Sequence, residues 1–223
     1  MSSLAIALPP TLHEGDRLDS AEFLHRWEAM PDLKHAELID GVVFMSSPVS
    51  LDHGDTHHDI STWVGVYRSR TPGCKSGVDS TWVMGPKDIP QPDVNLRILS
   101  ARGGQSGETG KYGAGAPELI VEISGSSLSR DLGIKLDLYR RVGVREYLTV
   151  QLNPRKIVWR ELVDGSYRDI QPDADAILRS LVFPGLWLDP EALWNGAPLP
   201  ALERGLASPE HAAFVQRLAL PVA

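Results

Sequence analysis

A short, nearly continuous apolar run over residues 118–123 constrains the fold of this chain more than any other feature. Apolar residues without alternation are typical of a central strand that is covered on both faces. A helical pattern over residues 129–142 follows, and a second strand pattern over 146–152 comes after Gly143. We therefore expect a strand–helix–strand unit at the centre of a sheet.

Turn and helix signals predict further elements around this unit. Asp40-Gly41 and Asp164-Gly165 each separate two strand patterns, and both residues of such a turn tolerate positive φ, which predicts two hairpins. Ser20 can cap a first helix. The remaining predictions are helices over 52–70 and near 190–194, strands over 81–84 and 93–98, and a Gly-rich loop, expected to be mobile, over 103–115. The expected fold class is α/β (α+β), a mixed β-sheet with helices on both faces.

Length and composition predict one domain. The chain has 223 residues, of which 42% are hydrophobic, enough for one substantial core. The low-complexity ends predict an N-terminal tail over 1–18 and a C-terminal tail or docking helix over 198–223, which leaves a domain over 19–197. No segment is long and apolar enough to span a membrane, no secretory signal is readable, and a lone Cys74 cannot close an internal disulfide. We expect a cytoplasmic protein.

The net charge of -7 counts against a surface broadly adapted to nucleic acid, because such binding rests on Lys and Arg. A local basic cluster could still serve, and one short segment is rich in basic residues. A solvated helix face is the simpler interpretation for most of them. Cys74 could be a nucleophile, but a small, partly buried residue is the better interpretation. The basic residues of the segment are Arg130, Lys135, Arg140, Arg141 and Arg145.

Two acidic residues, Asp93 and Glu122, fall on predicted strands that are buried or half buried. An ionised carboxylate in such a place must be paired, hydrogen-bonded or bound to metal, although a salt bridge at a strand end would also explain it. Asp131, Lys135 and Tyr139 follow at a spacing that places them on one helix face, where Lys135 could point toward Glu122. An ordinary Asp131–Lys135 helix pair is the alternative.

These residues lie within an ordered series of short motifs that resembles the Uma2 family over about residues 22–193. The resemblance implies a PD-(D/E)xK, restriction-endonuclease-like nuclease domain. It implies that Asp93 and Glu122 bind Mg²⁺, or Mn²⁺ as a substitute, with the Ile123 carbonyl as a third ligand. The motifs are Glu37-Leu38-Ile39-Asp40-Gly41, Gln91-Pro92-Asp93-Val94, Val121-Glu122-Ile123-Ser124, and Arg130-Asp131 with Lys135, Tyr139 and Gly143-Val144-Arg145-Glu146-Tyr147.

The same resemblance implies further roles. Glu37 would be the early acid of the site. Ser124 stands where many nucleases of this fold have lysine, so Lys135 would take over that role, with Asp131 and Tyr139 in support. Gly125 also departs from the usual turn of the family. The implied activity is metal-dependent endonucleolytic hydrolysis of DNA by a homodimer, and Lys135 would either add positive charge or act as a base.

Two alternatives stay open. His53 and His57 are spaced i, i+4 on a predicted helix, as metal ligands sometimes are, so a zinc hydrolase is conceivable, although the glutamate of an H-E-x-x-H helix is absent. The other is a catalytically silent interaction or DNA-binding module that keeps the nuclease fold. An open cleft shared by Asp93, Glu122 and Lys135 would favour the enzyme, whereas a filled or ion-paired site would favour the silent module.

Overall fold

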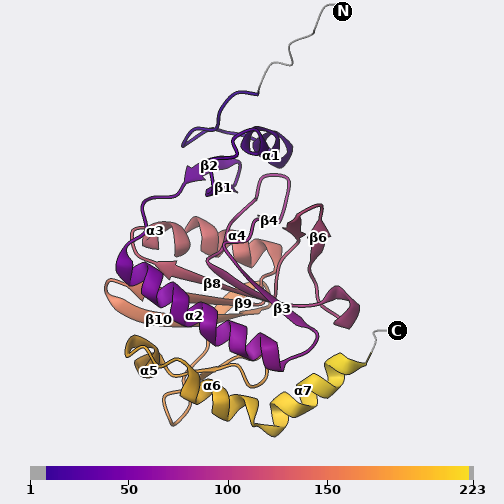
Figure 1. The fold of residues 1–223 in the computed structure, drawn as a ribbon, viewed down its shortest axis with the longest axis vertical. Coiled ribbons are helices and arrows are strands. Elements are labelled where there is room, and N and C mark those ends of the chain that lie inside the picture. The colour runs from indigo at the N-terminus through magenta and orange to yellow at the C-terminus, as the bar shows by residue number, and fades with distance from the viewer. Residues whose placement is uncertain (1–8, 221–223) are drawn as a thin grey trace, which may run out of the picture.

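The computed structural model describes residues 9–220, so residues 1–8 of the predicted N-terminal tail lie outside it (Figure 1). A six-stranded sheet has the order β11-β10-β9-β8-β5-β3. Its central pair, β8 and β9, is parallel, and the other pairs are antiparallel, so the predicted mixed sheet is confirmed. The strands are β3 (Cys74–Val78), β5 (Val94–Ile98), β8 (Leu119–Ser124), β9 (Glu146–Leu152), β10 (Arg155–Val163) and β11 (Ser166–Asp169).

The helical part of the strand–helix–strand unit is broken. The predicted helix over 129–142 is instead α3 (Leu128–Asp131) followed by α4 (Ile134–Val142). Gly133 separates them with φ -112° and ψ -102°, and a Cβ there would lie 2.7 Å from the Ser129 carbonyl oxygen. The break separates α3, which contacts β8, from α4, which contacts β1.

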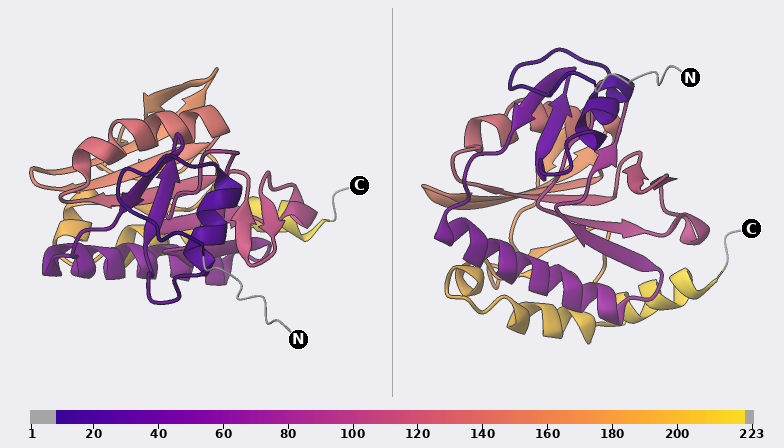
Figure 2. Two further views of the ribbon diagram at one scale, coloured as in Figure 1. Left: turned by 90° about the horizontal axis from the view of Figure 1, so that it is seen from above. Right: turned by 45° about the horizontal axis from the view of Figure 1, so that its top comes forward.

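Helices cover both faces of the sheet (Figure 2). The long helix α2 (Leu51–Arg70) packs on one face, and α3 with α4 packs on the other. Leu119, Val121 and Ile123 of β8 join the core on the α2 side, because side chains of a strand alternate between its faces. Ile120 lies in the core on the α4 side, so Glu122 also points toward α4.

An N-terminal layer sits against the edge of this body. It consists of α1 (Ser20–Glu28) and the predicted hairpin of β1 (Ala36–Ile39) and β2 (Val42–Met45), whose turn residues have φ of 50° and 75°. The prediction of Ser20 as the helix cap is wrong. The Asp19 side chain accepts from the Glu22 N–H instead, and the Ser20 hydroxyl donates to the Gly85 carbonyl.

Several short strands were not expected. The predicted loop over 103–115 holds β6 (Gly107–Thr109) and β7 (Tyr112–Ala114), which form a small sheet with β4 (Trp82–Val83) after the 3-10 helix η1 (Ser100–Arg102). Glycine-rich strands of three residues carry no apolar pattern that would reveal them. The sequence patterns also do not predict β3, β12 (Leu178–Arg179) and β13 (Trp187–Leu188).

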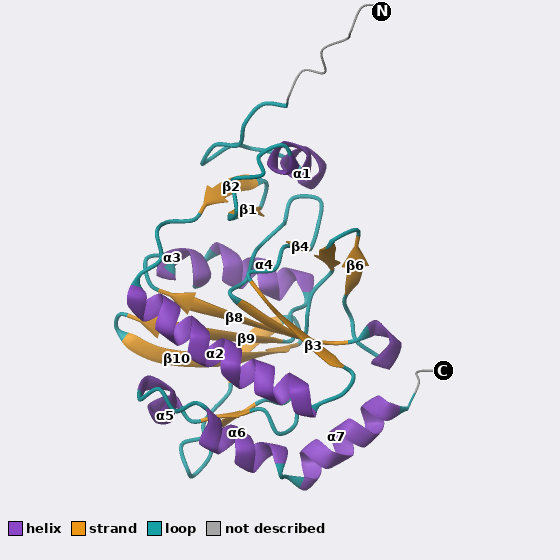
Figure 3. Cartoon of the chain, viewed as in Figure 1, coloured by secondary structure: helices purple, strands orange, loops and turns teal. Residues whose placement is uncertain are grey.

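Helices α5 (Pro190–Trp194), α6 (Leu199–Leu206) and α7 (Pro209–Ala219) complete the described chain (Figure 3). Leu202 of α6 and Phe214 of α7 belong to the main core, and Leu12 near the other end is buried in the N-terminal core. The domain boundaries at 18 and 197 stay predictions. No helix within residues 9–220 is long and apolar enough to cross a membrane.

Substitution of two helical glycines tests the close packing of α6 against the segment around Gly185. A Cβ at Gly205 would lie 2.2 Å from the Gly185 carbonyl oxygen, whereas a Cβ at Gly65 in α2 would meet no heavy atom within 4 Å. We expect Gly205→Ala to lower the free energy of unfolding by about 1–3 kcal/mol through overpacking. The matched Gly65→Ala is expected to raise it by up to about 1 kcal/mol, because alanine favours helix. Urea unfolding of both variants checks this, and equal effects would contradict the close contact.

Candidate functional site

Asp93 and Glu122 lie close to the ends of two neighbouring strands and line one cleft. The pairing of β5 with β8 ends at Val94 and Val121, and Asp93 and Glu122 are the next residues of the two chains beyond that pair. The Ile123 N–H donates to Asp93 Oδ2 at 2.6 Å, which ties the loop before β5 to β8. The charge of Asp93 opposes ionisation of Glu122, so the two acids together favour a compensating positive charge nearby.

Lys135 supplies a positive charge between two strands and a helix. Its Nζ lies 2.9 Å from Glu122 Oε1 and 2.8 Å from Glu37 Oε1, and its side chain is only 5% exposed. The Tyr139 hydroxyl, one helical turn further along α4, donates to the same Glu122 Oε1 at 2.7 Å. Sequence-predicted residues from β1, β8 and α4 thus meet at one place.

Asp131 joins this cluster through two hydroxyl groups. Ser124 and Ser127 donate to its Oδ2 at 2.8 and 2.6 Å, and its Oδ1 lies 3.9 Å from Lys135 Nζ. Asp131 Oδ1 is buried without a hydrogen-bond partner. Ser124, the residue in the place of the motif lysine, therefore fastens α3 to the end of β8, while Lys135 reaches the site from α4.

The cluster opens into a cleft of about 770 Å³ between the N-terminal layer and the main sheet. Asp93, Glu122 and Lys135 all line it, which is the arrangement expected of an enzyme, yet Lys135 is ion-paired, which is the arrangement expected of a silent module. Glu37, His53, Ile123, Arg130 and Asp131 line the same cleft. The structure thus brings together the predicted acids, the lysine and the Ile123 backbone.

The Uma2 family model, described as "Putative restriction endonuclease", matches residues 21–191, which is most of the chain. The chain belongs to the Uma2 family. A solved structure with a similar fold is that of "a putative nuclease belonging to DUF820" from Anabaena variabilis ATCC 29413. It is 13% identical with a TM-score of 0.55, and the match covers 76% of this chain and 97% of that one. This likeness supports the restriction-endonuclease-like fold; no curated protein matches the chain.

The ionisation of the Uma2 site follows from burial and from the crowding of acids. Burial, together with Asp93, Asp131 and Glu37, raises the pKa of Glu122 well above its ordinary value, and Lys135 only partly offsets this. Burial acts to lower the pKa of Lys135, but the surrounding carboxylates outweigh it and raise that pKa. The raised pKa of Lys135 favours a role as a positive charge over a role as a base.

His53 and His57 of α2 both face Asp93. His53 Nε2 lies 3.6 Å from Asp93 Oδ2, and His57 Nε2 lies 3.0 Å from the Asp93 backbone oxygen. Burial opposes ionisation of Asp93, but the nearby His53 ring and the hydrogen bond from the Ile123 N–H outweigh it and lower the pKa of Asp93. Within the described residues no group of three or more His, Cys, Asp or Glu side chains is arranged to hold a metal, so the zinc alternative lacks the ligand set that zinc usually takes.

The basic residues of the segment 130–145 lie in different environments in the structure. Arg141 pairs with Asp88 and Arg140 with Asp137, while Arg145 is exposed. Only Arg130 and the buried Lys135 line the cleft, so a continuous basic face is not formed by these residues. Cys74 is buried, and burial raises the pKa of its thiol to about 12, which favours the structural interpretation over a nucleophile.

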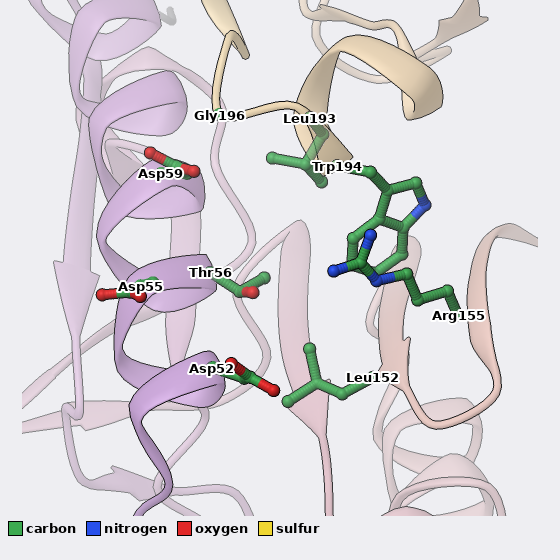
Figure 4. A pocket seen from close by; sticks show the side chains of 9 residues that line it. All are labelled: Asp52, Asp55, Thr56, Asp59, Leu152, Arg155, Leu193, Trp194 and Gly196. Carbon is green, nitrogen blue, oxygen red and sulfur yellow. The ribbon is translucent and has the colours of Figure 1, made fainter.

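A second, smaller cavity of about 250 Å³ lies between α2 and the C-terminal part of the Uma2 chain (Figure 4). The Arg155 guanidinium stacks on the Trp194 ring on one wall, and Asp52 and Thr56 of α2 stand on the other. None of the residues predicted for the acid site lines this cavity. The chemistry expected of a nuclease is therefore confined to the larger cleft.

Proposed function

We propose that this Uma2 protein is an endonuclease that uses Mg²⁺ to hydrolyse phosphodiester bonds in DNA. The observation that carries the proposal is that Asp93, which accepts a hydrogen bond from the Ile123 N–H, and Glu122, the residue before Ile123, line the same open cleft. Two carboxylates in this position repel each other, and a divalent cation between them would convert the repulsion into binding.

The charges around the pair support a cation site. Four acids crowd this end of the cleft, and Lys135 is their one deeply buried counter-ion among the described residues. Only Oε1 of Glu122 accepts hydrogen bonds from the described residues, which leaves Oε2 as an acceptor without a partner. The acids are Glu37, Asp93, Glu122 and Asp131.

The donor set fits Mg²⁺ in particular. Mg²⁺ prefers oxygen ligands and keeps several waters, so the two carboxylates of Asp93 and Glu122 with the Ile123 carbonyl would suffice without a larger protein cage. When bound, the ion would activate a water molecule and stabilise charge on the phosphate oxygens. Lys135 keeps Glu37 and Glu122 in place and adds positive charge, and Tyr139 fixes the orientation of Glu122. Mn²⁺ is expected to substitute.

A second candidate is the catalytically silent module, which the pairing of Lys135 with two carboxylates favours. In that case the ion pairs would be the permanent state of the site, and no metal would enter. DNA as the partner, a two-fold homodimer that would act on both strands, and a cytoplasmic location belong to the endonuclease proposal.

Calorimetry with Mn²⁺ and plasmid cleavage test the proposal on wild type, Glu122→Ala and the exposed control Glu203→Ala. We expect wild type and the control to bind Mn²⁺ and to nick the plasmid. Glu122→Ala should lose at least about a hundredfold in metal affinity and in cleavage, because even indirect partners of metal ligands cost 10- to 100-fold. If wild type binds no Mn²⁺, the silent module replaces the endonuclease.

A further inference from the structure

Two of the three Lys and Arg side chains that line the cleft, Lys135 and Arg130, differ widely in accessibility, and Lys135 is fully engaged. Lys135 Nζ touches Glu37 and Glu122 at hydrogen-bond distance, and its side chain is 5% exposed. To contact a substrate it would have to leave two buried carboxylates unpaired, which is strongly unfavourable. Lys135 is therefore suited to hold the acids and poorly placed to contact a phosphate group directly.

Arg130 has the opposite character. Its side chain is 25% exposed and lines the cleft beside the acids. Its nearest acidic partner is Glu37, with 3.7 Å between Nη1 and Oε2, which is beyond hydrogen-bond distance. Among the described residues no acceptor forms a hydrogen bond with the Arg130 guanidinium, so its donors are available to a ligand in the cleft.

The guanidinium is nevertheless held in place. Its Cζ lies 4.9 Å from the centre of the Phe44 ring of β2, a cation–π contact between the N-terminal layer and α3. Glu37 links the two cations, since its Oε1 contacts Lys135 and its Oε2 faces Arg130. The base of Arg130 is fixed as well, because its neighbour Asp131 is bonded to Ser124 and Ser127. A pre-positioned planar fork of donors matches the oxygens of a phosphate group.

We propose that Arg130 is the residue that binds the phosphate of the nucleic acid backbone in this cleft, while Lys135 balances the charge of the acids. The inference rests on the proposed function for the nature of the substrate. It differs from the family resemblance, which gives the catalytic cation as Lys135 alone. Lys34, the other lysine that lines the cleft, is exposed and donates to the Pro31 carbonyl on its own loop.

The test measures binding without cleavage. A fluorescent DNA duplex is titrated with the full chain in buffer with EDTA at several salt concentrations, and fluorescence anisotropy gives Kd. We expect Arg130→Gln to weaken binding by about ten- to a hundredfold and to reduce the slope of log Kd against log salt by about one, since one phosphate contact is lost. Arg130→Lys should keep the salt slope of wild type and show a Kd between those of wild type and Arg130→Gln. Lysine keeps the positive charge but lacks the planar pair of guanidinium donors. The exposed Arg145→Gln, with the same change of charge, should bind like wild type.

Mn²⁺ calorimetry on the same variants separates this inference from the proposed function. Arg130→Gln should bind Mn²⁺ as wild type does, because Arg130 is not a ligand of the ion. The inference is overturned if Arg130→Gln binds DNA like wild type, if Arg145→Gln loses as much affinity, if wild type shows no DNA binding, or if Arg130→Gln also loses Mn²⁺. Wild type that binds DNA through Arg130 but takes up no Mn²⁺ would instead support the inference and refute the endonuclease.

Discussion

Lys135→Met is expected to lower the free energy of unfolding by about 3–5 kcal/mol, the usual cost of removing one partner from a buried ion pair. The substitution keeps most of the side-chain volume and removes the charge that faces Glu37 and Glu122. Both carboxylates are largely buried at the base of the cleft, so water can replace the lost interaction only in part. Urea unfolding at neutral pH measures the change.

The exposed Lys156→Met in β10 serves as the control, with an expected change within about 0.5 kcal/mol. The double variant Lys135→Met with Glu122→Gln should lose less free energy of unfolding than Lys135→Met alone. One of the two carboxylates left without a counter-ion is then replaced by a neutral amide. A loss below about 1 kcal/mol for Lys135→Met would mean that the acids are compensated by something other than this lysine.

The pattern of the sequence predicts the elements that carry the site, and the reason is burial. An acid inside the apolar run of β8 has few explanations in a folded protein, so the sequence pattern alone singles out Glu122. The turn pairs at Asp40-Gly41 and Asp164-Gly165 likewise predict their hairpins, because few residues accept positive φ. Local sequence patterns predict structure reliably where only one backbone conformation is compatible with them.

Features that depend on contacts between distant segments were not predictable in this way. The break at Gly133 is one example, since an isolated glycine within a helical pattern does not reveal whether the chain turns there. The cleft position of Arg130 is another, because it depends on Phe44 from a hairpin far away in sequence. The spacing of His53 and His57 suggests zinc ligands, whereas the packing of α2 shows that both lie beside Asp93.

The place of Lys135 shows how sequence and structure complement each other. Ser124 departs from the expected lysine position, and the sequence offers Lys135 as a substitute on spacing alone. The structure shows that the substitution is geometrically consistent, since Lys135 Nζ reaches Glu122 from α4 while Ser124 holds Asp131. The surrounding carboxylates raise the pKa of Lys135, which favours a charge over a base as its proposed role.

Glu122→Gln is expected to raise the stability of the protein and to lower its activity, whereas Lys135→Met is expected to lower the stability. Gln can still accept hydrogen bonds from Lys135 and Tyr139, but it carries no charge next to Asp93. We expect the metal-free variant to be more stable than wild type by about 0.5–2 kcal/mol near pH 8, a common range for stabilising substitutions. Cleavage and Mn²⁺ affinity should fall at least about a hundredfold, because the variant lacks one of the two carboxylates proposed to hold the ion.

The stability difference between Glu122→Gln and wild type is expected to depend on pH. The pKa of Glu122 is raised in the folded state above its ordinary value of 4.5, chiefly by burial, so the folded protein binds this proton more tightly than the unfolded chain does. Its contribution to stability is therefore full below that ordinary value and is lost as pH rises through the folded pKa. Glu122→Gln has no such loss, so its advantage over wild type should widen between about pH 5 and about pH 8 in urea unfolding with EDTA, while Glu203→Gln should follow wild type throughout. An advantage that stays constant with pH, or a variant less stable than wild type at every pH, would show that the charge of Glu122 is already compensated without a metal ion.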